Sequence, residues 1–112
     1  MSLSKDNIIN LEDFRVTGAK VFTGRDRGLY VRTKCNIDEL ESKNSSMEII
    51  VPNNIYSINP SFFEELFLNV VLKLGRDEFL KKFKFTSQGS YNYERPLNEA
   101  IDRILRSKSA IG

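Results

Sequence analysis

The stretch that decides the fold runs from Met47 to Gly75 and reads MEIIVPNNIYSINPSFFEELFLNVVLKLG. Its apolar β-branched run, Ile49–Val51, predicts a short strand buried on both faces in the middle of a parallel sheet. Pro52 lacks a backbone N–H, so it ends this strand. The pair Asn53–Asn54 favours a turn, because asparagine tolerates left-handed backbone angles. We therefore expect a buried strand followed by a polar loop.

The loop leads into the strongest helix signal of the chain, which begins at Asn59. The side-chain oxygen of Asn59 can cap free backbone amides, and Pro60 has the backbone angle of a first helical position. Gly75 predicts the end of this helix, because glycine readily adopts the left-handed cap conformation. Apolar side chains at helical spacing form one face wide enough to cover a sheet. They are Phe63, Leu66, Phe67, Val70, Val71 and Leu74.

Three more large apolar side chains of this helix project towards its polar side, namely Phe62, Leu68 and Leu72. Large exposed apolar patches are uncommon, so these groups need a cover. In one interpretation, a neighbouring helix or the tail of the same chain covers them. In the other, they form the interface of a homodimer or of a complex with a partner protein. The sequence leaves both open.

The length and the charge of the chain indicate its number of domains and the kinds of partner to expect. A chain of 112 residues is long enough for one core. We divide it into an N-terminal segment with the first strand (residues 1–15) and one α/β domain (residues 16–112). The 17 basic and 15 acidic residues leave a net charge of +2. This balance gives no reason to expect binding to nucleic acid or to an anionic membrane.

The inventory of reactive side chains argues against an enzyme. The chain has no histidine and one cysteine, so the commonest general base and the usual zinc ligands are missing. We expect no catalysis, no cofactor and no metal. The single Cys35 excludes an internal disulfide and predicts a reducing, cytoplasmic location, with Cys35 itself a small buried apolar residue. Membrane contact is not expected, because no apolar run reaches transmembrane length.

Strands and helices are predicted to alternate along the rest of the chain. The predicted strands lie around Ile8–Leu11, Ala19–Phe22 and Lys84–Thr86, and the predicted helices cover Arg25–Cys35, Arg76–Phe83 and Glu94–Ser107. Such alternation predicts an α/β fold, in which a small open sheet of about four parallel or mixed strands has helices packed on it.

The segment 36–46 between two of these elements is polar and acidic. Ile37 and Leu40 are expected to anchor one irregular turn, and the remainder is expected to be a solvated connection. The segment lacks the glycine turn of a calcium loop, so its acidic side chains predict a solvated face and no metal site. These side chains are Asp38, Glu39 and Glu41.

Two loops follow the carboxyl ends of predicted strands, where ligands gather in open α/β sheets. They are Thr23–Gly28 and Asn53–Ser61, and we expect them to lie near one another. The first reads TGRDRG before a helix. Free amides, a positive helix end and fork-shaped donors are what an anion site needs. A nucleotide- or phosphate-binding site, even a slow hydrolase, would use Thr23, Gly24, Arg25, Arg27 and Gly28.

The same loop also has a purely structural interpretation. Gly24 and Gly28 then serve backbone geometry, with Gly28 allowing close helix-to-sheet approach, and the arginines pair with nearby acids. Short glycine-rich strings often arise without a ligand, so this interpretation is favoured. A second polar loop, Ser87–Tyr93, has tyrosines and nearby lysines, as surfaces for single-stranded nucleic acid do. Three lysines and two tyrosines are a small footprint, so nucleic acid is not the expected partner.

Three segments resemble the STAS-like family of unknown function, which is related to the anti-sigma-factor antagonists. They are TGRDRG at 23–28, EIIVPNNIYSINPSFF at 48–63 and LGRDEF at 74–79, and the resemblance covers most of the chain from about Val16 onward. The resemblance implies a small STAS-like α/β domain in bacterial cytoplasmic signalling. It implies a domain that acts by contact with another protein, such as an ATPase of the histidine-kinase type.

In better-known STAS domains, a serine in the motif Asp-Ser-Ser-Gly at a helix start is phosphorylated. The matching residues here are Asn59-Pro60-Ser61-Phe62, so the acceptor position is Pro60, which has no hydroxyl. We therefore expect Ser61 to serve in capping or packing. The resemblance and the surplus apolar groups together predict a partner-binding surface around the loop Asn53–Ile58. Its residues are Asn59, Ser61, Phe62, Leu68 and Leu72.

Overall fold

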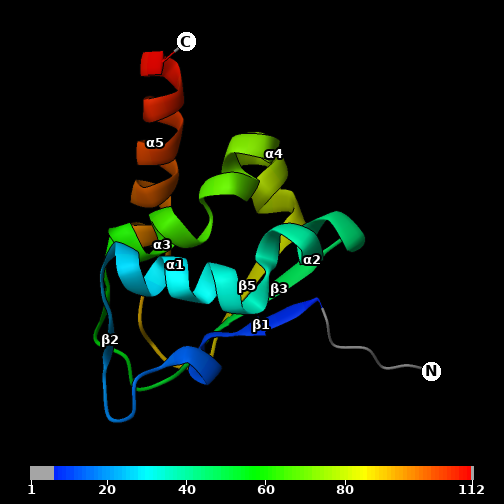
Figure 1. The fold of residues 1–112 in the computed structure, drawn as a ribbon. Coiled ribbons are helices and arrows are strands. Elements are labelled where there is room, and N and C mark those ends of the chain that lie inside the picture. Colours follow the sequence, from blue (N-terminus) through cyan, green and yellow to red (C-terminus); the bar gives the residue numbers. More distant parts are fainter. Residues whose placement is uncertain (1–6, 112) are drawn as a thin grey trace, which may run out of the picture.

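The computed structural model describes residues 7–111 of the chain, with side chains for residues 7–107. In chain order its elements are β1 (Ile8–Asn10), the 3₁₀ helix η1 (Leu11–Phe14), β2 (Val21–Phe22), α1 (Gly24–Cys35), α2 (Ile37–Lys43), β3 (Met47–Val51), β4 (Ser57–Ile58), α3 (Pro60–Leu66), α4 (Leu68–Lys82), β5 (Phe83–Ser87) and α5 (Glu94–Ile111) (Figure 1). The predicted α/β class and the alternation of strands and helices are confirmed.

The strands of residues 7–111 form two parallel sheets, where about four strands in one sheet were expected. The larger sheet has the order β1-β3-β5, so Ile49 lies between Ile9 and Phe85 on its two neighbours. The smaller sheet pairs β2 with β4, with Phe22 opposite Ile58. The predicted central position of Ile49–Val51 is confirmed.

The central strand β3 is buried on one face only, so the prediction of burial on both faces was wrong. Met47, Ile49 and Val51 are buried, whereas Glu48 and Ile50 on the other face are half-buried. Figure 1 shows α2 and α4 on one side of the larger sheet. Successive side chains of a strand point to opposite faces, so only every second residue of β3 reaches these helices.

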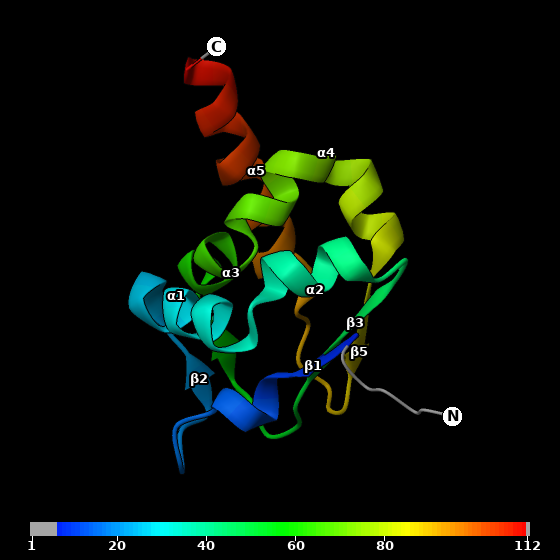
Figure 2. The ribbon, with the colours of Figure 1, turned by 45° about the vertical axis from the view of Figure 1, so that its right-hand side comes forward.

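The helix that begins at Pro60 is confirmed, but it is divided. One helix, α3, ends at Leu66 and the next, α4, begins at Leu68, with Phe67 outside helical geometry (φ −101°, ψ 9°). Gly75 interrupts α4 at the predicted helix end, with φ 79° and ψ 170°. The part of α4 after Gly75 is the predicted short helix, and Figure 2 shows the resulting bend.

Phenylalanine rings fill the space between these helices and the larger sheet. The fully buried rings are Phe22, Phe62, Phe63, Phe67, Phe79 and Phe83. The division at Phe67 places its ring at the centre, 5.6 Å from the ring of Phe63 and 5.2 Å from that of Phe79. Burial of one such ring stabilises the fold by about 1.5–3 kcal/mol, so this cluster holds the helices on the sheet.

Segment 36–46, predicted as a solvated connection, is largely the helix α2. Asn36 adopts a left-handed conformation (φ 54°) that ends α1 and lets α2 begin at once. Ile37 is fully buried, and Glu41, predicted to face solvent, is only 2% exposed. The carboxylate of Glu41 lies 2.7 Å from the ammonium groups of both Lys73 and Lys82. These lysines are distant in the sequence, which is why the local pattern did not reveal the burial of Glu41.

Candidate functional site

The carboxyl ends of β2 and β4 lie side by side, and this is where the candidate site is found. Since Phe22 is opposite Ile58 in a parallel pair, Thr23 and Asn59 follow as neighbours. The N–H of Asn59 donates to the C=O of Phe22 at 2.8 Å. The predicted proximity of the loops Thr23–Gly28 and Asn53–Ser61 is therefore confirmed.

Helices α1 and α3 begin at these two strand ends and run side by side (Figure 2). The side-chain oxygen of Asn59 accepts a hydrogen bond of 2.9 Å from the N–H of Ser61, which confirms the predicted cap of α3. Thr23, in contrast, makes no side-chain cap bond within the described residues, and Gly24 has a left-handed φ of 71°. The side chain of Thr23 therefore does not cap the first turn of α1.

The two helices touch at Gly28, which is buried against α3. A Cβ atom at Gly28 would overlap the carbonyl oxygen of Phe62 and come within 2.9 Å of the Cβ of Glu65. Close approach at Gly28 was predicted, but against the sheet. The structure shows a helix-to-helix contact instead, because α3 lies between α1 and the rest of the core.

The surplus apolar groups of α3 and α4 are covered to different extents. Phe62 is fully buried, with its ring 5.0 Å from the ring of Phe22. Leu68 and Leu72 are half-buried against the same core. Of the two interpretations of these groups, cover by the chain itself therefore applies to Phe62. Of the residues expected to bind a partner, Asn59 is exposed and Ser61 is half-buried.

The arginines of the TGRDRG loop have different surroundings. Arg25 contacts the carboxylates of Glu64 at 3.3 Å and of Glu65 at 3.5 Å, as the structural interpretation of the loop expects. Arg27 stacks on the ring of Tyr30 with 4.7 Å between the guanidinium carbon and the ring centre. Exposed ion pairs of this kind stabilise a fold by less than about 1 kcal/mol. The ion pairs of Arg25 therefore contribute more to the orientation of α1 on α3 than to the stability of that contact.

A hollow of about 470 Å³ lies over the first turn of α1. Its lining residues are Thr23, Asp26, Arg27 and Tyr30. A hydroxyl, a carboxylate, a guanidinium and an aromatic ring together suit the mixed polar and apolar groups of another protein. For an anion, the carboxylate of Asp26 opposes the attraction of Arg27.

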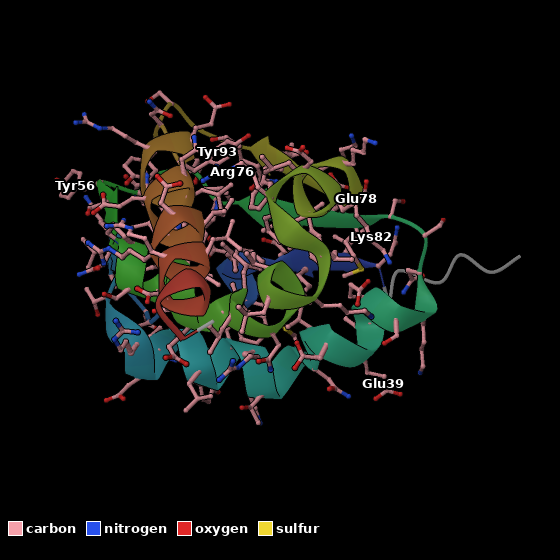
Figure 3. All side chains as sticks on the ribbon, turned by 90° about the horizontal axis from the view of Figure 1, so that it is seen from above. Glu39, Tyr56, Arg76, Glu78, Lys82 and Tyr93 are labelled. Carbon is pink, nitrogen blue, oxygen red and sulfur yellow. The ribbon has the colours of Figure 1, made fainter. Side chains whose placement is uncertain are left out.

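Tyr30, which lines this hollow, is one of several large apolar side chains that are exposed on the molecule. Among the described residues, six large apolar side chains are more than a third exposed, and five of them belong to residues 16–30 or to Tyr56. These five are Val16, Val21, Leu29, Tyr30 and Tyr56. Tyr56 is 72% exposed, and its N–H donates to the C=O of Lys20 at 2.7 Å, which joins it to β2. Figure 3 shows Tyr56 at the rim of the molecule, pointing outward.

We call these five residues, with the basic Lys20, Arg27 and Lys34, the β2–α1 surface. The ammonium of Lys20 lies 5.5 Å from the ring centre of Tyr56, and that of Lys34 lies 5.9 Å from the ring centre of Tyr30. This surface was not predicted from the sequence. A signal was present, because Leu29 and Tyr30 fall outside the buried face of α1.

The two tyrosines of the Ser87–Tyr93 loop and Cys35 are held in structural positions. The hydroxyl of Tyr91 accepts a hydrogen bond of 3.0 Å from the N–H of Ile58, and the ring of Tyr93 stacks on Phe85 at 5.3 Å. Both tyrosines are half-buried, so neither offers a free face to a base. Cys35 is half-buried, and burial raises the pKa of its thiol to about 11. Its thiol is therefore protonated at neutral pH and unreactive as a nucleophile.

The described residues contain neither a metal-binding cluster nor a helix that could span a membrane. No group of three histidine, cysteine, aspartate or glutamate side chains there is placed to hold a metal ion. None of the described helices combines the length and apolar character needed to cross a bilayer. No protein-family model, curated protein or solved structure matches the chain. Its function is therefore inferred from the geometry described above.

Proposed function

We propose that this chain is a non-catalytic regulatory module that binds another protein through the β2–α1 surface. The observation that supports it most is the concentration of exposed tyrosine and aliphatic side chains on β2, on α1 and at Tyr56. Exposed apolar groups that gather in one region commonly mark sites of protein contact. Tyrosine and arginine are also enriched at the centres of protein interfaces.

Tyr30 is the proposed centre of the contact. Tyr30 is 45% exposed, and its ring contacts the cationic groups of both Arg27 and Lys34. Such contacts hold an aromatic side chain in one orientation before binding, which lowers the entropy that an interface loses on association. The hollow beside Tyr30 offers a place for a side chain of the partner.

Asn59 and Ser61 are the proposed rim of the contact, at the start of the neighbouring helix α3. Phe62 has an indirect role in this proposal, because its buried ring packs on Phe22 and thereby positions β2. Leu68 and Leu72 lie farther along the chain on α4. The STAS-like resemblance supports a partner in bacterial signalling, and we include an ATPase of the histidine-kinase type as the proposed class of partner.

Substitution of the exposed tyrosines tests this proposal. The tagged chain is used to isolate a partner from its native extract, and the purified pair is then measured by calorimetry. Tyr30→Asp and Tyr56→Asp are expected to weaken binding at least about tenfold with unchanged melting temperature, as interface hot spots do. Ser45→Asp, exposed between α2 and β3 and outside both the β2–α1 surface and β5, is the control of equal added charge and is expected to bind as the wild type. Equal binding by all three variants would reject the proposal.

Nucleotide or phosphate binding at the Thr23–Gly28 loop is a second candidate function. The hollow over the uncapped first turn of α1 supports it, with Arg27 as its cation. Its support is smaller, because Arg25 already contacts two glutamates and Asp26 lines the hollow. Calorimetry with inorganic phosphate and a panel of nucleotides tests it. Heat that disappears in Arg27→Ala supports this function, and no heat, or heat unchanged in Arg27→Ala, rejects it.

A further inference from the structure

A second surface, separate from the β2–α1 surface, lies along β5. This strand is at the edge of the larger sheet, where β3 is its neighbour among the described strands. Its pairing with β3 extends over the whole strand, from Met47 opposite Phe83 to Val51 opposite Ser87. The other side of β5 is therefore an edge that another strand can join.

The direction of the outer backbone groups follows from one hydrogen bond. The N–H of Gln88 donates to the C=O of Val51 at 2.8 Å, so it points towards β3. Backbone groups of successive residues alternate between the two sides of a strand. The N–H and C=O of Phe85 and the N–H of Ser87 therefore point away from β3. Within the described residues, neither N–H makes a backbone hydrogen bond outside the sheet.

A hollow of about 240 Å³ with both apolar and polar lining residues adjoins this edge. We call it the β5 groove, and its lining residues are Leu80, Phe83, Lys84, Phe85, Tyr93, Glu94, Leu97 and Asn98. It lies on the helix-covered side of the sheet, and Figure 3 shows Tyr93 between β5 and the start of α5. Small-molecule pockets usually exceed about 300 Å³, so the groove suits single side chains better than a cofactor.

Leu80 connects the groove to solvent. It is 37% exposed and is the sixth of the exposed large apolar side chains, the one outside the β2–α1 surface. An edge of outward backbone groups and an adjoining groove that can accept a side chain are the two parts of a site for strand addition. Main-chain hydrogen bonds supply the affinity of such a site, and pockets for alternate side chains supply its specificity.

Charge indicates the kind of strand that fits. Lys84 is exposed on the side of β5 opposite to Phe85, next to the exposed Thr86. A residue directly across from Lys84 lies on the same face, where an opposite charge stabilises the pair and a like charge destabilises it. The residue across from Phe85 lies on the groove side. The added strand is therefore expected to alternate apolar and acidic residues.

We propose that the outer edge of β5 binds an extended segment of a partner protein by strand addition, with an apolar side chain in the β5 groove and an acidic side chain across from Lys84. A second copy of β5 is a poorer occupant. Antiparallel self-pairing centred on Phe85 places the two Lys84 side chains at diagonal positions, within reach of each other. Edge lysines of this kind are a common device against self-association of sheets.

A short synthetic peptide is the direct probe. We expect acetyl-Ser-Val-Glu-Val-Glu-Val-Ser-amide to slow amide hydrogen exchange at Phe85 and Ser87, about fivefold when four-fifths of the sites are occupied. Exchange at Gln88, which already bonds to β3, is the internal control and is expected not to change. The same peptide with N-methyl groups on its valines is expected to have no effect. No slowing at Phe85 and Ser87 with about 5 mM peptide would overturn the proposal.

Variants of the edge separate strand addition from adventitious binding. Ser87→Pro removes an outward N–H and is expected to weaken peptide binding about fivefold, whereas Ser87→Ala keeps that N–H and binds as the wild type. Lys84→Glu is expected to reverse the preference, so that a peptide with lysine in place of glutamate binds better. Equal affinity of Ser87→Pro and Ser87→Ala, or an unchanged charge preference in Lys84→Glu, would overturn the proposal.

Two further outcomes distinguish this site from its alternatives. Leu80→Asp is expected to abolish peptide binding, and Tyr30→Asp is expected to leave it unchanged, so failure at one surface is distinct from failure at the other. Sedimentation of the full chain tests for self-pairing. A dimer that forms in the wild type and is lost in Ser87→Pro would overturn the proposal, because a second copy would then occupy the edge.

Discussion

Glu41 shows at the scale of a single residue how a buried charge is kept in this fold. Burial opposes its ionisation, but the hydrogen bonds and charges of Lys73 and Lys82 outweigh burial and hold the pKa of the Glu41 carboxyl below its ordinary value. An additional bond links the ammonium of Lys82 to the C=O of Glu41 at 2.8 Å. This one side chain therefore fastens α2 to both parts of α4.

Removal of this charge is expected to destabilise the chain. In Glu41→Gln, the half-buried Lys82 loses its carboxylate partner, which we expect to cost about 2–3 kcal/mol of unfolding free energy. Urea unfolding at pH 7 measures this change. The control is Glu39→Gln, because Glu39 pairs with Lys43 in solvent and its loss is expected to cost less than about 0.5 kcal/mol. Equal costs for the two variants would contradict the role assigned to Glu41.

The same carboxylate gives stability a defined pH dependence. The pKa of Glu41 is lower in the folded state than its ordinary value of 4.5, so its contribution is complete above that value. It is lost as the pH falls through the lower folded-state pKa. Unfolding free energies measured from pH 7 to pH 3 are expected to fall less in Glu41→Gln than in the wild type. Parallel curves for the two proteins would show that Glu41 is not the source of this dependence.

Arg15 joins the 3₁₀ helix η1 to two loop segments through one guanidinium group. Its Nη2 donates to the C=O of Asn53 and to the carboxylate of Glu12, both at 2.7 Å, and its Nη1 donates to the C=O of Ala19 at 3.3 Å. Lysine lacks this fork of donors. Arg15→Lys is therefore expected to lower the unfolding free energy by about 1–2 kcal/mol, measured by urea unfolding. An unchanged midpoint in the variant would contradict this role.

At the scale of elements, the contact between α1 and α3 depends on Gly28. Alanine in an exposed helix position stabilises by about 1 kcal/mol relative to glycine. Here the added methyl group would overlap the carbonyl of Phe62, so Gly28→Ala is expected to destabilise by about 1–3 kcal/mol. Thermal unfolding measures the difference, with Thr33→Ala on the exposed side of α1 as the control. A higher melting temperature in Gly28→Ala would contradict the close contact.

Elements defined by local signals could be predicted from the sequence. The strand Ile49–Val51, the capping Asn59 and the helices α1 and α5 each have a pattern or a capping residue within a few positions. The division of α3 from α4 at Phe67 and the helix α2 have no comparable local signal. Phe67 leaves helical geometry where its ring joins those of Phe63 and Phe79, and α2 is held by lysines more than 30 residues away.

At the scale of the whole molecule, the candidate site was only partly predictable. The proximity of the loops after β2 and β4 could be predicted, because the loops that follow the carboxyl ends of parallel strands gather at one edge of a sheet. The burial of Phe62 could not, because its ring packs on that of Phe22, which is distant in the sequence. The exposed Leu29 and Tyr30 were visible in the pattern of α1, whereas the position of Tyr56 beside Lys20 depends on the pairing of β2 with β4.

The fold thus separates its supporting parts from the surfaces for which we propose a binding role. The larger sheet and its phenylalanine cluster support the smaller sheet and α1, where the exposed apolar side chains gather. The outer edge of β5 is a second, independent surface. A regulatory module that contacts two segments of a partner at once would bind more tightly than either contact alone.

Photo-crosslinking in the native cell tests the central proposal most directly. p-Benzoylphenylalanine is placed at position 30 or 56, replacing Tyr30 or Tyr56, and at position 77, replacing the exposed Asp77 of α4. A protein-binding β2–α1 surface predicts a discrete crosslinked partner from positions 30 and 56 and none from position 77. Absence of a crosslinked partner at positions 30 and 56, or the same products from position 77, would contradict it.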